Sequence, residues 1–225
     1  MSDMRIIRVK GKGQIRVRPD MTRITLTLEG TCPQYGEALH RSAQETGQLK
    51  DILALHDFER SDLKTLYFNV DTEYENYKEN HTYKKRFVGY KFRHVLKLEF
   101  DSDNERLGRI LYALANSPMN PEIRISYTVK DKETAKNELL GKAVADAKTK
   151  AAILAQAAAV TLKDIQSIDY SWGEINFEAQ PMKRAFFAED QPRGIVPHDG
   201  IDFDIEPDDI EVSDTVTVVW EIGDV

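Results

Sequence analysis

The chain has 225 residues, of which 41% are hydrophobic and 31% charged, and its net charge is −7. This composition excludes a disordered or fibrous protein and predicts a globular one, long enough to bury a core without covalent cross-links. A single cysteine, Cys32, excludes an intramolecular disulfide and fits a reducing compartment. The first residues lack an apolar signal-peptide segment, and no apolar run approaches the roughly 20 residues of a membrane helix. We therefore expect a cytoplasmic protein without a membrane span.

The charges are unevenly distributed along the chain. Residues 178–211 contain ten acids and three bases, so the whole net charge lies there, whereas residues 5–18 contain six bases and no acid. The basic segment at 5–18 and the acidic residues at 199–211 both predict strands, and opposite charges on two exposed strand edges would set the partner and the orientation in an assembly. We predict a homo-oligomer held partly by charge, with association residues on the basic strand: Arg8, Lys10, Lys12 and Arg16. If both segments pair within one chain, the complementarity is internal instead.

Hydrophobic periodicity predicts the elements of the first half in chain order. Residues 7–17 alternate as a half-buried strand, and Gly11 and Gly13 on its inward face indicate a bulge or a close backbone approach. The elements that follow are a strand at 24–28, a helix from Pro33 to residue 56, a strand at 66–70, a polar hairpin loop at 75–86, a strand at 90–100, a helix from a Ser102–Glu105 capping box to residue 114, and a strand at 123–129.

The order strand, helix, strand, strand, helix, strand over residues 22–130 is that of a split βαβ, or ferredoxin-like, core. The basic strand would extend its sheet. A long helix at 132–159 with a narrow stripe of mostly alanines follows, then strands near 164–172 and 216–222. Residues 178–200 hold three prolines and few periodic apolar positions, which predicts a flexible, acidic, exposed loop. We expect one α+β domain over 1–225, with a mostly antiparallel sheet.

Five short motifs along the chain, in their order and spacing, match the pattern of a known family. They are Gly11-Lys12-Gly13, Pro19-Asp20, Gly89-Tyr90, an alanine-rich run at 139–155, and Ile205-Glu206-Pro207 before the last strand. Together they resemble the SIMPL-domain family over nearly the whole chain. Leu139-Leu140-Gly141 and Val160 depart from the pattern, where alanine and arginine, and a helix-ending glycine, are usual. The resemblance implies a largely unknown function, a role in stress response, and no catalytic residue to carry over.

His94 is the one candidate for a general base, because histidine titrates near neutrality and His94 lies on the apolar face of a predicted strand. The alternative is a core histidine with a hydrogen-bonded partner, since the sequence places no acid or nucleophile beside it. Gly11-Lys12-Gly13 lies inside a strand, which excludes a phosphate-binding loop. We expect no cofactor.

The acidic alternation near residues 199–211 is the candidate cation site. Asp202, Asp204 and Glu206 share one strand face about 6–7 Å apart, a spacing that suits a loose Ca²⁺ or Mg²⁺ site. A solvated edge strand explains the same pattern. The basic strand and several aromatic residues would suit a phosphate backbone, but the acidic overall balance argues against nucleic acid.

Three functional hypotheses follow from these patterns. The first is a non-enzymatic, self-associating cytoplasmic protein. The second is a small-molecule or divalent-cation binding module that uses the acidic segment. The third is an enzyme centred on His94.

Overall fold

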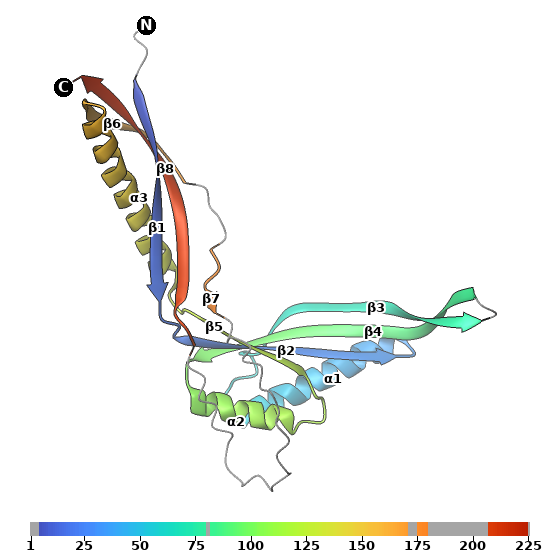
Figure 1. Cartoon of the computed structure of the whole chain (residues 1–225). Coiled ribbons are helices and arrows are strands. Elements are labelled where there is room, and N and C mark those ends of the chain that lie inside the picture. Colours follow the sequence, from blue (N-terminus) through green and yellow to red (C-terminus); the bar gives the residue numbers. More distant parts are fainter. Residues whose placement is uncertain (1–4, 80–81, 171–174, 180–206, 225) are drawn as a thin grey trace, which may run out of the picture. The chain divides into compact units, whose positions relative to one another are not determined.

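The computed structural model describes residues 5–79, 82–170, 175–179 and 207–224 (Figure 1). These residues form two compact units, each with its own sheet and core. Of the described residues, unit 1 comprises 5–19, 128–170, 175–179 and 208–224, and unit 2 comprises 20–79, 82–127 and 207. The expected loop at 178–200 lies outside the described residues, apart from the two-residue strand β7 (Glu178–Ala179). The α+β class and the antiparallel sheets are confirmed.

Unit 1 is a three-stranded antiparallel sheet covered by one long helix. Its strands are β1 (Ile6–Val17), β8 (Ile210–Asp224) and β6 (Val160–Asp169), in the order β1-β8-β6. The prediction that the basic strand extends the sheet of residues 22–130 is therefore wrong, because β1 pairs with β8 in a separate sheet. The helix α3 (Lys132–Ala157) begins at the N-cap Asp131, whose carboxylate accepts a hydrogen bond from the Thr134 N–H. Its buried positions recur every four residues: Ala135, Leu139, Ala143, Ala147, Ala151 and Ala155.

Two glycines bring β1 and α3 into backbone contact. A Cβ at Gly11 would lie 2.0 Å from the Ala143 carbonyl oxygen, and a Cβ at Gly13 would lie 2.1 Å from that of Leu139. No side chain fits in either space, so only glycine at these two strand positions allows this packing. The close backbone approach expected from the sequence is therefore present.

The outer edge of β1 is occupied by side chains of α3. The Lys12 N–H donates to the Asp146 carboxylate at 2.7 Å, and the Lys150 ammonium lies 3.5 Å from the Lys10 carbonyl oxygen. Lys150 also pairs with Asp146 at 2.6 Å. These two backbone groups of the edge have partners within the chain, and an added strand would have to displace them.

Unit 2 contains four strands and two helices in the order strand, helix, strand, strand, helix, strand. Its elements are β2 (Met21–Cys32), α1 (Tyr35–Ala54), β3 (Lys64–Glu79), β4 (Thr82–Asp101), α2 (Asn104–Ala115) and β5 (Glu122–Thr128). Within this unit the strands lie in the order β3-β4-β2-β5. Both helices cover one face of the sheet (Figure 1), where residues such as Leu26, Phe92 and Leu96 are fully buried.

Helix α1 does not face the sheet with its first two large apolar residues. Tyr35 and Leu39 are exposed, and Ala38 and Ser42 are buried in their place. Tyr35 instead packs its ring edge-on against Tyr90, with 5.7 Å between ring centroids. The Ser42 hydroxyl is tolerated inside because it has a hydrogen-bond partner in the sheet.

The hairpin loop predicted at 75–86 is wrong. Strands β3 and β4 continue to Glu79 and from Thr82, and together they form a long ribbon. The polar composition of this segment is typical of a loop. Cross-strand pairs stabilise the two strands here, among them the ion pair Glu75–Arg86 and the ring contact Tyr74–Phe87.

The predicted cap of the second helix is displaced by one residue. Asp103, not Ser102, caps α2, and its carboxylate accepts from the Arg106 N–H at 3.0 Å. The Ser102 hydroxyl instead lies 3.3 Å from that of Thr22.

We predict that Gly11→Ala destabilises the protein by about 3 kcal/mol or more, because the added methyl group overlaps the α3 backbone. Gly141→Ala is the matched control. Gly141 lies on α3, and a Cβ at this position would have nothing within 4 Å. The substitution should stabilise the chain by about 0.5–1 kcal/mol. Urea unfolding of both variants measures the two changes. Equal effects would contradict the close contact.

Candidate functional site

His94 lies on the helix-covered face of β4, at the centre of a cluster of hydroxyl groups. Its Nδ1 is 3.0 Å from the Ser42 hydroxyl oxygen and 3.1 Å from that of Thr46, both on α1. Its Nε2 is 2.9 Å from the hydroxyl oxygen of Thr65 on β3. The ring also packs edge-on against Phe68 at 5.0 Å between centroids. Both ring nitrogens therefore have partners.

The hydrogen-bond network assigns the proton on the ring. The Thr46 hydroxyl already donates to the Ser42 carbonyl oxygen at 2.8 Å, so its oxygen accepts from Nδ1–H. Nε2 then carries the lone pair and accepts from the Thr65 hydroxyl. Burial lowers the pKa of His94 below its ordinary value of 6.5, and the positive charge of Lys50 lowers this pKa further. The imidazole is therefore neutral at pH 7.

This cluster can hold a neutral imidazole in one orientation, but it differs from a catalytic triad. In such triads a carboxylate orients the histidine and stabilises its protonated form. Here hydroxyls of Ser42 and Thr46 occupy that position, and Ser42 is only 2% exposed. The sequence located His94 on an apolar face. The sequence analysis did not predict the hydrogen-bond partners of His94. The available signal was the spacing of Ser42 and Thr46, two hydroxyl residues four positions apart on one helix.

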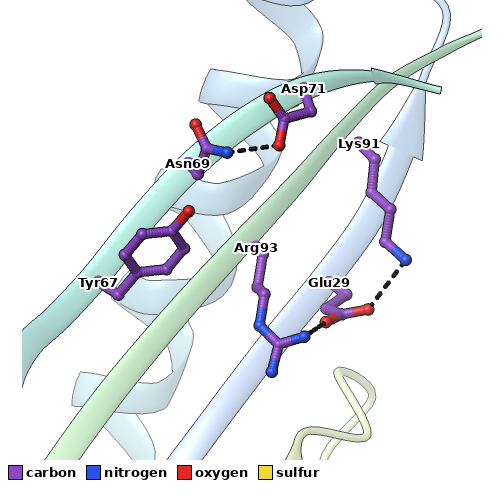
Figure 2. A pocket seen from close by; sticks show the side chains of 6 residues that line it. All are labelled: Glu29, Tyr67, Asn69, Asp71, Lys91 and Arg93. Carbon is purple, nitrogen blue, oxygen red and sulfur yellow. Dashed lines mark hydrogen bonds and ion pairs between the residues drawn. The ribbon is translucent and has the colours of Figure 1, made fainter.

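A concave site lies on the opposite, helix-free face of the unit 2 sheet (Figure 2). It is a depression of about 200 Å³ lined by Glu29, Tyr67, Asn69, Asp71, Lys91 and Arg93. Glu29 accepts from the Arg93 guanidinium at 2.8 Å and pairs with the Lys91 ammonium at 3.1 Å. Two acids and two bases leave no net charge to select an ion, and the volume is below the 300–1,000 Å³ that is usual for ligand pockets.

The other residues singled out from the sequence lie apart from these two sites. The predicted cation ligands Asp202, Asp204 and Glu206 are outside the described residues. Within the described ranges, no three His, Cys, Asp or Glu residues gather closely enough to hold a metal ion. Cys32 is buried at the end of β2. Among the helices that the structure describes, none combines the length and apolar character needed to cross a membrane.

The predicted association residues lie on the face of β1 that points away from α3. They alternate with Val9, Gly11 and Ile15, which are buried under the helix. Arg16, at one end of the row, pairs with Glu211 of β8 at 2.5 Å. One predicted association residue, Arg16, is thus paired with the acidic segment inside the chain.

A family model described as SIMPL, a protein of unknown function (DUF541), matches residues 7–220, which span both units. The chain belongs to the SIMPL family. No curated protein is similar enough to this chain to count as a match. The SIMPL match thus agrees with the resemblance found in the motifs, and it adds no catalytic or binding residue to them.

We predict that acid weakens the fold through His94. The unfolded chain binds this proton more tightly than the folded chain, because the folded-state pKa is lowered from 6.5. The free energy of unfolding should therefore be highest above pH 6.5 and should fall as the pH drops through 6.5 towards the folded-state pKa. Urea unfolding at a series of pH values measures this slope.

Variants of two histidines isolate this contribution. His94→Gln should lower stability at pH 8 by roughly 1–3 kcal/mol, because it disturbs buried hydroxyl partners, and it should flatten the acid slope. His40→Gln, on the exposed face of α1, is the control and should change neither. An unchanged slope in His94→Gln would contradict the assignment of the slope to this residue.

Proposed function

We propose that this SIMPL-family protein is a non-enzymatic, self-associating protein of the cytoplasm, and we extend the stress-response role to it on family resemblance alone. The observation that carries self-association is the central row of β1, which comprises Arg8, Lys10 and Lys12 (the basic row). These residues are exposed on one strand face, about 6–7 Å apart. Their Cα partners on β8 are a valine and two threonines. The basic row therefore faces no acid on the neighbouring strand.

The two ends of β1 differ from this central row. Arg5 pairs with Asp224 at 2.6 Å and Arg16 with Glu211 at 2.5 Å, so both ends are neutralised within the chain. Within the described residues, no ion pair forms at Arg8, Lys10 or Lys12. A cationic row of this kind suits an acidic segment, and the chain itself carries one near residues 199–209. Charge complementarity of this type sets the orientation of an assembly more than its affinity.

The basic row would act through its side chains and not through strand addition. Asp146 and Lys150 of α3 already satisfy the β1 backbone at Lys10 and Lys12. Exposed charge pairs contribute only about 0–1 kcal/mol each and weaken with salt. Apolar burial elsewhere must therefore supply most of the interface.

The surroundings of His94 support the non-enzymatic part of the proposal. Its three partners are hydroxyls, one of them buried, and the shallow depression of Figure 2 lies on the opposite face of the sheet. A reaction would need the imidazole and a bound substrate on the same side. The cation-binding alternative depends on Asp202, Asp204 and Glu206, and nothing in the described residues favours it.

We also infer that unit 2 is a split βαβ, ferredoxin-like core. Its elements follow the order strand, helix, strand, strand, helix, strand, and its strands lie in the order β3-β4-β2-β5. The first strand of each half thus lies at the centre of the sheet, as in that fold. Many unrelated functions occur on this fold, so it adds nothing to the functional argument.

We predict that the native protein sediments as an oligomer at micromolar concentration in low salt. Reversal of the basic row by Arg8→Glu, Lys10→Glu and Lys12→Glu should shift it towards smaller species, and added salt should do the same to the wild type. Sedimentation velocity at two salt concentrations measures both effects.

The matched control reverses three exposed lysines of α3: Lys136→Glu, Lys142→Glu and Lys148→Glu. It changes the net charge equally but leaves β1 intact, so its oligomer should resemble the wild type. A monomeric wild type would refute self-association. An oligomer that tolerates the β1 reversal and is insensitive to salt would remove the charge mechanism.

A further inference from the structure

The ribbon of β3 and β4 extends beyond the rest of the unit 2 sheet. Strand β2 pairs with β4 only as far as Cys32 and Tyr90. Past that point, among the described residues, β3 and β4 pair only with each other, over residues 73–79 and 82–89, which we call the arm (Figure 1). A glycine marks its base, since a Cβ at Gly89 would lie 2.5 Å from the Cys32 carbonyl oxygen. The arm is therefore a two-stranded ribbon without a third strand.

Both long edges of the arm are open in the described part of the chain. Strand β3 is the first strand of its sheet, and β4 loses its second neighbour where β2 ends. Neither strand contains proline. A two-stranded ribbon is marginally stable alone, and a long open edge is a template for another strand. On β1, by contrast, α3 blocks the edge at Lys10 and Lys12.

One face of the arm carries a row of aromatic rings. Edge-to-face contacts run from Tyr35 to Tyr90, from Tyr90 to Phe87 and from Phe87 to Tyr74, at 5.4–5.7 Å between centroids. Tyr74 and Phe87 are 54% and 45% exposed, although they lie in the middle of a ribbon. Half-exposed aromatic groups gathered in this way are typical of association surfaces.

The two strands of the arm carry opposite charges on the other face. Glu73 and Glu75 alternate on β3, while Lys84 and Arg86 alternate on β4. Arg86 pairs with Glu75 across the ribbon. Two β3 edges brought together would place acid beside acid, and two β4 edges would place base beside base. Only a β3 edge beside a β4 edge places opposite charges next to each other.

We infer that the arm binds a second copy of this chain, with the β3 edge of one arm paired antiparallel to the β4 edge of the next. This inference rests on the self-association proposed above and gives it a location. The glutamates of one arm then lie beside Lys84 and Arg86 of the next, and the aromatic faces form one surface. The contact uses two different edges, so it is head-to-tail and the arms point the same way. Such contacts generate rings or filaments, not twofold dimers.

The test uses sedimentation velocity and native mass spectrometry on the full chain. An acidic variant carries Lys84→Glu and Arg86→Glu, and a basic variant carries Glu73→Lys and Glu75→Lys. Each variant alone places like charges at the interface and should associate at least about tenfold more weakly than the wild type. An equimolar mixture should recover the oligomer, because each β3 edge then finds an oppositely charged β4 edge.

A fourfold variant with both reversals is the matched control. It restores opposite charges across its own ribbon, so it should form oligomers alone and should not co-assemble with the wild type. Circular dichroism checks that each variant folds. If the two single-sign variants do not fold, the fourfold variant decides the question, since its co-assembly with the wild type would overturn the inference.

The remaining outcomes separate the two proposals. A folded mixture that stays monomeric would overturn the head-to-tail pairing. An oligomer that ignores the arm variants but dissociates after reversal of the basic row would overturn the arm inference and leave the proposed function standing. A wild type that is monomeric at micromolar concentration would overturn both.

Discussion

The hydrogen-bonding capacity of an edge strand is the constraint on which much of this structure depends. Every backbone N–H and C=O group at a sheet edge needs a partner in water, in the chain or in another molecule. Unit 1 meets this need at β1 with the Asp146 carboxylate and the Lys150 ammonium of α3. In unit 2, no described residue pairs with the outer edge of β3 along the arm. The β3 edge is therefore available to a partner strand, whereas the β1 edge is occupied by side chains of α3.

The same helix that covers β1 also explains why this part of the chain is rich in small residues. The Gly11 and Gly13 backbones approach α3 so closely that its facing positions are mostly alanine. The approach brings a helix carboxylate within 2.7 Å of a strand N–H. Bulkier residues would separate the two elements and expose the edge. Packing and edge protection in unit 1 thus depend on the same residues.

Much of the fold could be predicted from periodicity, because local patterns report on burial. The strand at 7–17, its two inward glycines and the long helix after residue 131 all follow from spacing alone. The arm could not be predicted in this way. Its strands are exposed on both faces, so they lack the alternation that marks a half-buried strand. Periodicity also placed His94 on a face but could not find its partners, because these come from two elements far away in the chain.

Cys32 gives this architecture a built-in chemical reporter. It is the only cysteine in the sequence, it is 8% exposed, and it lies at the last pair of β2 with β4, where the arm begins. Its thiol is shielded in the folded chain and would become accessible to a reagent when the structure around it opens locally. The rate at which a thiol reagent modifies the unaltered protein therefore measures how often this junction opens. Assembly through the arm would slow that rate without any engineered label.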